Sequence, residues 1–199
     1  MTEEMAMLIL LGVQTTEHGG AEEKRELEEL LSGVAAGDRE ALARLYHRTR
    51  TAVYGLALSY LKNAQDAQDV TQDTFVRVWD SAHQYRPKGS PMGWLLAVTK
   101  NLALMKLRQR TRQVELDDEE WDAIPADDAS VSPEDRQILQ TALAKLGDQE
   151  RQVVLLHAVT GLKHREIAAL LELPLATVLS KYHRALKKLR VQLEGDDTL

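Results

Sequence analysis

Six polar side chains near the C-terminus share one face of a helix predicted to begin at Leu175. We call this set the basic ridge, and its members are Thr177, Ser180, Lys181, Arg184, Lys187 and Lys188. A ridge of this kind fits the major groove of duplex DNA, where Arg and Lys reach guanine edges and Ser, Thr and Lys reach phosphates. A solvated basic face is the alternative for this helix alone. The short helix predicted over residues 165–171 and the turn at 172–174 favour DNA binding, because they complete a helix-turn-helix pattern.

A second group of cations lies near the middle of the chain. We call it the basic cluster, and its members are Arg86, Lys88, Lys100, Lys106, Arg108, Arg110 and Arg112. Tyr85 and Trp94 lie beside it in the sequence, although the spacing of Trp94 is more typical of core packing. Cations that hold phosphate beside rings that stack on bases suit a strand of nucleic acid whose bases are unstacked.

Side-chain patterns typical of catalysis are absent from the sequence. It has no Gly-rich phosphate loop, no His-Glu-x-x-His and no nucleophile elbow. The carboxylates of Asp69 and Asp73 have no neighbours that predict desolvation, which a general acid requires. His164 and His183 match no ligand spacing and are interpreted as surface or capping side chains. We therefore expect no enzyme, no catalytic residue, no metal, no cofactor and no small-molecule substrate.

The charge of the chain is unevenly distributed. The formal net charge is −6, but residues 31–114 hold six acids and thirteen bases, and residues 136–199 hold seven acids and ten bases. Residues 115–135 hold ten acids and no base. Two basic bodies joined by an acidic segment can still bind nucleic acid, whereas a uniformly acidic protein would repel it.

The elements that must position these groups are predicted to be helices throughout. Apolar residues recur at helical spacing from Glu22 to Val34, from Arg39 to about Leu61 and over about 64–81, and Ser90-Pro91 begins the helix that carries most of the basic cluster. The fold class is therefore all-α, with two small helical domains joined by an acidic flexible linker. We assign residues 1–33 to an N-terminal extension, 34–113 to the first domain, 114–132 to the linker and 133–199 to the helix-turn-helix domain.

The cellular compartment is suggested by two absences. Cysteine is absent, so burial rather than disulfides must hold the fold together, and a reducing cytoplasm fits. The apolar run from Met5 to Val13 is shorter than the roughly 20 residues that span a bilayer, and Glu3 and Glu4 stand where a signal peptide has positive charge. We expect a cytoplasmic protein without membrane insertion.

Three stretches of sequence resemble the extracytoplasmic-function (ECF) sigma factors of bacterial RNA polymerase, a branch of the sigma-70 superfamily. Residues 66–79 (DAQDVTQDTFVRVW) are similar to the family's polymerase-binding helix, and residues 93–104 (GWLLAVTKNLAL) to its minus-ten-element helix. Residues 161–171 (GLKHREIAALL), with 174–178 (PLATV) and 183–185 (HRA), are similar to its C-terminal helix-turn-helix. The resemblance covers about residues 34–192.

The resemblance implies a role for each group of residues. An acidic face, comprising Asp66, Asp69, Gln72, Asp73, Val76 and Arg77, would bind core RNA polymerase, and all but Asp66 share one helical face away from Phe75. The minus-ten element of promoter DNA would be held as a single strand by Arg86, Lys88, Lys100, Asn101, Lys106, Arg108 and Arg110. The basic ridge would bind the minus-thirty-five element as duplex. An anti-sigma factor is a further expected partner.

Some positions depart from the family pattern, and other hypotheses remain. Ala176, Leu179, Met105 and Lys163 are unusual, and Lys163 should weaken one helix start by about 1 kcal/mol because it lacks a capping side chain. A polymerase-independent helix-turn-helix regulator leaves the acidic face unexplained. A sigma-like decoy that binds regulators but not DNA predicts loss of the ridge cations, which are present.

Overall fold

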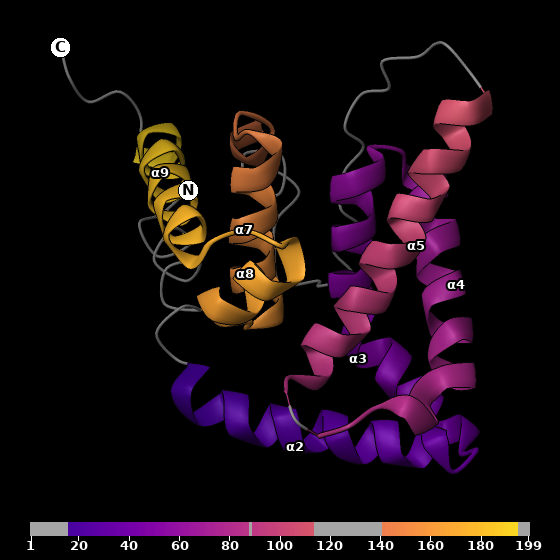
Figure 1. The fold of residues 1–199 in the computed structure, drawn as a ribbon. Coiled ribbons are helices and arrows are strands. Elements are labelled where there is room, and N and C mark those ends of the chain that lie inside the picture. The colour runs from indigo at the N-terminus through magenta and orange to yellow at the C-terminus, as the bar shows by residue number, and fades with distance from the viewer. Residues whose placement is uncertain (1–15, 88, 114–140, 195–199) are drawn as a thin grey trace, which may run out of the picture. The chain divides into compact units, whose positions relative to one another are not determined.

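The computed structural model describes residues 16–87, 89–113 and 141–194, and nothing in those ranges is a β-strand. The elements are α2 (Thr16–Ala35), α3 (Arg39–Leu61), α4 (Ala64–Ser81), the 3-10 turn η1 (Ala82–Gln84), α5 (Pro91–Gln113), α7 (Asp148–Thr160), α8 (His164–Leu171) and α9 (Leu175–Glu194), and residues 141–144 are also helical (Figure 1). The all-α prediction is confirmed. The linker assigned to 114–132 and the apolar run from Met5 to Val13 lie outside the described residues.

The helix boundaries follow from local capping chemistry. The Asp38 carboxylate accepts the Glu40 and Ala41 backbone N–H groups at 2.8 and 3.2 Å and begins α3. The Asn63 side chain begins α4 by accepting the Asp66 N–H. Ser90 accepts the Gly93 N–H at 3.1 Å immediately before Pro91, as the sequence predicted for the start of α5. These caps satisfy amide groups that a helix start otherwise leaves unpaired.

The first compact unit is built around α3, α4 and α5, which lie side by side (Figure 1). Its core includes Ala57, Leu58, Leu61, Ala67, Val70 and Ala103, all nearly inaccessible to solvent. The inward face of α4 comprises Val70, Thr74, Phe75 and Val78, which are all buried. Because this side of α4 is buried, its opposite side is turned toward solvent. Most residues of the acidic face lie on that solvent-exposed side.

Helix α2 packs onto this first unit. Leu27, Leu30, Leu31 and Val34 are all buried, and a Cβ at Gly33 would lie only 2.8 Å from Ala41 Cβ of α3. The compact unit accordingly begins at residue 19. The domain boundary between residues 33 and 34 stays a prediction from the sequence, while the apolar stripe of α2 is covered in this unit.

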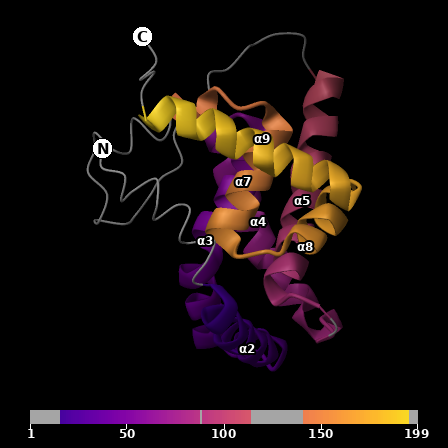
Figure 2. The same cartoon turned by 90° about the vertical axis from the view of Figure 1, so that its left-hand side faces the viewer.

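The second unit contains α7, α8 and α9, and Figure 2 shows α9 crossing α7. Its core includes Val153, Leu156, Leu162, Ile167, Val178 and Ala185, each 2% exposed or less. Helix α7 ends at Gly161, which has a left-handed φ of 64°. The turn between α8 and α9 begins at Glu172, also left-handed with φ 57°, a conformation uncommon for a residue with a Cβ. A short helix, a tight turn and a longer helix follow one another, as the helix-turn-helix pattern predicted.

Candidate nucleic-acid and polymerase interfaces

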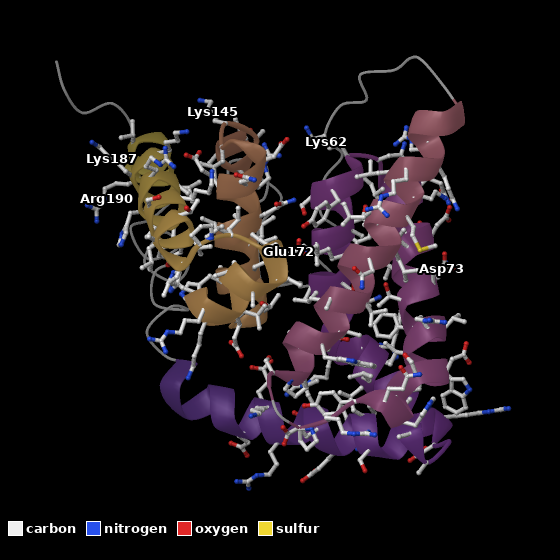
Figure 3. All side chains as sticks on the ribbon, in the orientation of Figure 1. Lys62, Asp73, Lys145, Glu172, Lys187 and Arg190 are labelled. Carbon is white, nitrogen blue, oxygen red and sulfur yellow. The ribbon has the colours of Figure 1, made fainter. Side chains whose placement is uncertain are left out.

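The acidic face lies on α4 and is divided by burial. Gln72, Asp73, Val76 and Arg77 are exposed, and Figure 3 shows Asp73 on the outer side of the helix. Val76 is 62% exposed, which is unusual for a branched apolar side chain surrounded by polar neighbours. These four residues are open to a partner as the structure stands.

The other two residues of the acidic face are engaged within the molecule. Lys106 of α5 lies 3.1 Å from Asp66 and 3.2 Å from Asp69, and Arg110 lies 3.2 Å from Asp66. Arg110 also donates to the Leu61 carbonyl at 3.4 Å, which ties the network to the end of α3. The pKa of Lys106 lies above its ordinary value, chiefly because hydrogen bonds to Asp66 and then Asp69 favour the ammonium form. Residues that the sequence assigned to two different surfaces form one four-charge network.

The basic cluster is less open than its sequence implied. Lys100 is 9% exposed, whereas Asn101 beside it and Arg108 are exposed. Arg86 is exposed and donates to the His83 and Tyr85 carbonyls at 2.9 and 3.1 Å, which orients its guanidinium. Lys88 and the side chain of Arg112 lie outside the described residues. The exposed residues of this region are therefore Arg86, Asn101 and Arg108, whereas the Lys106 and Arg110 cations are paired with carboxylates.

The two aromatic residues beside the basic cluster contact each other. The Tyr85 and Trp94 rings meet edge to face with centroids 5.6 Å apart, and both residues are half-buried. The Tyr85 hydroxyl donates to Glu28 of α2 at 3.5 Å. Burial first, and then the Glu28 carboxylate, raise the pKa of Tyr85. The expected core packing of Trp94 is partly met, and α2 helps to hold this aromatic pair.

The basic ridge lies along α9, opposite its packed face. Val178, Tyr182, Ala185 and Leu189 are buried, and Leu186 is half-buried. Ser180, Arg184, Lys187 and Lys188 are exposed, whereas Thr177 and Lys181 are half-buried. Lys187 and its neighbour Arg190 point away from α9 (Figure 3). The spacing predicted from sequence therefore yields an open, positively charged helix surface.

One residue that sequence reasoning missed connects α7 to this ridge. Glu150, 8% exposed, accepts Lys188 Nζ at 2.7 Å, and Arg184 Nε lies 3.9 Å from its other oxygen. The pKa of Glu150 lies below its ordinary value, chiefly because the Lys188 hydrogen bond favours the carboxylate. Its position three residues after Gly147 signals a helix cap, but no sequence pattern pairs it with α9.

Comparison with known proteins places the chain in a family. The sigma-70 region 2 model matches residues 45–113, and the sigma-70 region 4 model matches residues 136–189. The ECF RNA polymerase sigma factor SigK of Mycobacterium ulcerans is 31% identical over 177 residues, which are 85% of this chain and 95% of that relative. The chain belongs to the ECF sigma factors. The ECF sigma factor SigE of Mycolicibacterium smegmatis is 38% identical over 169 residues, 78% of this chain, but only 64% of SigE is covered.

Solved structures share the fold of this ECF sigma factor. CnrH, solved in complex with the cytosolic domain of CnrY, is 25% identical with a TM-score of 0.58, covering 86% of this chain and 99% of CnrH. The sigma factor RpoE of Bartonella quintana, solved with the anti-sigma factor NepR, is 22% identical with a TM-score of 0.61, covering 77% and 97% respectively. The similarity to RpoE supports the helical fold alone.

Two further observations concern membranes and metals in the described part of this sigma factor. None of its helices is long and apolar enough to cross a membrane. No group of three or more His, Cys, Asp or Glu side chains there is placed to hold a metal ion.

Of the two histidines considered in the sequence, His183 is exposed as expected, whereas His164 is half-buried. His164 was expected at the surface or in a cap, but it packs against His157 and Tyr182, with ring centroids 4.5 and 4.7 Å away. Its Nε2 atom, like His157 Nε2 and the Tyr182 hydroxyl, is buried and has no hydrogen-bond partner among the described residues. The pKa of His164 lies below its ordinary value, mainly because of burial and then because of His157 and His183. The rings of His157, His164 and Tyr182 contact one another, and this ring packing accounts for the partial burial of His164.

Proposed function

We propose that this chain directs core RNA polymerase to specific promoters and helps to open them for transcription initiation. As an initiation factor it would act through the polymerase, without a chemical reaction of its own. The observation that supports this most is the pairing of an open, partly apolar face on α4 with an open basic ridge on α9 in one chain. A DNA-binding regulator that acts alone needs the second surface but has no use for the first.

The α4 surface is proposed to dock on core polymerase. Gln72, Asp73, Val76 and Arg77 would form the direct contact because they are exposed. Asp66 and Asp69 border that contact, and their carboxylates also hold Lys106 and Arg110 of α5. Charge complementarity at the edge of such a surface sets the association rate and the choice of partner, while an apolar centre such as Val76 supplies desolvation energy.

The DNA contacts are proposed to divide between the two units. Arg86, Asn101 and Arg108, with Lys88, Lys100, Lys106 and Arg110, would hold the minus-ten element as an unpaired strand. The basic ridge on α9 would enter the major groove of the minus-thirty-five element, with Arg184 the strongest candidate for a guanine edge. Loss of one bidentate base contact of this kind is worth about 1–3 kcal/mol and is confined to one base position.

An anti-sigma factor and a cytoplasmic location complete the proposal. RpoE of Bartonella quintana, which has the same fold, was solved with the anti-sigma factor NepR, and we extend that class of partner to this chain. Core polymerase and promoter DNA are cytoplasmic, so the proposed activity places the protein there too.

The proposal is tested by run-off transcription with purified core polymerase on a promoter library, followed by sequencing of the transcript starts. We expect starts at a defined set of sites only when the chain is added. Asp73→Lys should weaken binding to core polymerase at least tenfold, because it reverses the charge of an exposed residue in the docking face. Glu29→Lys is the control, since Glu29 is an exposed acid on α2 outside that face. Absence of any defined start, or equal polymerase affinity for Asp73→Lys and the unmodified chain, would contradict the proposal.

A further inference from the structure

The basic ridge contains two kinds of cation. Lys188 and Arg184 share the Glu150 carboxylate of α7, at 2.7 and 3.9 Å, although their side chains are 51% and 61% exposed. Lys181 and Lys187 make no ion pair within the described part of the chain. Two cations of the ridge are therefore anchored to the body of the second unit, and two others are held only by their own helix.

The anchoring carboxylate is enclosed. Glu150 is 8% exposed, and among the described residues its one hydrogen-bond partner besides the cations is the Gly147 backbone N–H, 3.3 Å from Oε2. If Lys188 left for a phosphate, a nearly buried carboxylate would keep only the Gly147 N–H as a hydrogen-bond donor and Arg184 at 3.9 Å, which is unfavourable. Lys188 can add a DNA contact with its remaining N–H groups, but it cannot easily leave Glu150. The same carboxylate draws Arg184, whose Nε also donates to the Ser180 carbonyl at 3.3 Å.

Such anchoring affects the two modes of DNA binding differently. Binding to random sequence grows with the number of phosphates that cations neutralise, wherever those cations happen to lie. Binding to a chosen sequence depends on donors that sit in one geometry relative to base edges. A cation partly neutralised by a fixed carboxylate contributes less to the first mode and keeps its geometry for the second.

We propose that Glu150 is a specificity-determining residue of the α9 surface, which restrains Lys188 and Arg184 from indiscriminate phosphate binding and positions them for the promoter duplex. The inference rests on the proposed function for the identity of the duplex. The restraint itself is a property of the second unit and can be measured without polymerase. Glu150 acts through the two cations and does not touch DNA.

The decisive variant is Glu150→Gln in the full-length chain. Glutamine keeps an oxygen that can accept the Gly147 N–H, so the start of α7 is preserved while the charge that holds Lys188 is removed. Affinity for a random-sequence DNA duplex is measured by fluorescence anisotropy over a series of salt concentrations. We expect the slope of log affinity against log salt to become more negative by about 1 to 2, since each added phosphate contact contributes roughly 0.9. Affinity for the random duplex at about 0.1 M salt should rise roughly tenfold for each cation released.

The matched control is Glu166→Gln. Glu166 occupies the equivalent capping position of α8, where it accepts the Lys163 N–H at 2.8 Å, and it makes no ion pair among the described residues. Glu166→Gln removes the same charge from the same unit but releases no cation of the basic ridge, so it should leave the salt slope unchanged. In a second control, Lys188→Gln added to Glu150→Gln should remove most of the gain in random-sequence affinity. Thermal melting of each variant establishes that the second unit is folded.

Specificity is measured with the polymerase holoenzyme on a promoter that the run-off transcription experiment has identified. Glu150→Gln should lower the ratio of promoter affinity to random-duplex affinity several-fold. An unchanged salt slope and random-duplex affinity, an equal change in Glu166→Gln, or no measurable duplex binding by either chain would overturn the role of Glu150. A changed salt slope with no defined transcript start would retain the restraint and refute the proposed function instead, so the two failures are distinguishable.

Discussion

Arg151 provides the most demanding test of how the second unit is held together. Its guanidinium is enclosed, with the side chain 8% exposed, and Nε donates to the Leu143 carbonyl at 2.8 Å. Nη2 donates to the Ala144 and Leu146 carbonyls at 3.0 and 2.9 Å, and Nη1 lies 3.5 Å from an Asp148 oxygen. These three carbonyls lie at or just after the end of the helical residues 141–144, and the Leu143 carbonyl also accepts the Leu146 backbone N–H at 3.1 Å. Arg151 therefore joins the end of one helix to the start of α7.

The expected loss in Arg151→Met follows from these bonds. A hydrogen bond to a charged group is worth about 1.5–3 kcal/mol, so three of them set an upper bound near 9 kcal/mol. Water can reach some of the carbonyls after the change, and methionine retains part of the buried stem. We therefore expect the free energy of unfolding of the second unit to fall by about 3–5 kcal/mol, the usual cost of removing one partner from a buried charged network. Arg151→Lys should recover less than half of it, because a single ammonium cannot match the guanidinium fork.

The measurement is urea unfolding of the full chain followed by far-ultraviolet circular dichroism, with amide hydrogen exchange over residues 141–194. Trp79 and Trp94 lie in the first unit, so their fluorescence transition should not move. Arg165→Met is the control, since Arg165 is exposed on α8. If the free energy of unfolding falls by less than about 1 kcal/mol in Arg151→Met, or by an equal amount in the control, Arg151 does not stabilise the end of this helix as described.

Two further predictions concern helix packing and pH. Gly33→Ala should destabilise the first unit by about 1–3 kcal/mol, because its Cβ would lie 2.8 Å from the nearest side-chain carbon of α3. Gly55→Ala should instead stabilise the unit by about 0.5–1 kcal/mol, because a Cβ there meets nothing within 4 Å. Thermal melting of both variants is the measurement, and the opposite order of melting temperatures would contradict the packing of α2 on α3. The pKa of His164 is lowered by burial and then by His157 and His183, so the folded state favours the neutral ring and the unfolded chain binds a proton more readily near the ordinary value of 6.5. The free energy of unfolding of the second unit should thus be highest above about pH 6.5 and should decrease as the pH falls below that value. Urea titrations at several pH values measure this decrease, and His164→Gln should make it smaller. The same pH profile in His164→Gln and the unmodified chain would be inconsistent with a buried neutral ring.

The fold was predictable from sequence where local chemistry decides it. Asp38, Ser90 with Pro91, and Gly161 mark helix ends through bonds or backbone geometry that involve residues close in the chain. The inward face of α9 follows from the spacing of apolar residues such as Val178. In these cases the determining interaction spans a few residues, so a single sequence carries enough information.

The partners of charged side chains were not predictable in the same way. Lys106 reaches Asp66 across 40 residues of sequence, and Lys188 reaches Glu150 across 38. Helical spacing tells which face a residue occupies, but not which helix packs against that face. The same limit explains why the burial of Lys100 was not foreseen.

The four-charge network of α4 and α5 links two surfaces that would otherwise vary independently. A substitution at Asp66 that suits another polymerase also disturbs Lys106 and Arg110, which lie on the helix proposed to hold the opened strand. Designers who want this scaffold to recognise new promoters while keeping its polymerase should therefore alter α9 and leave the contact between α4 and α5 untouched. Divergence of promoter preference through the first unit would require paired changes on both helices.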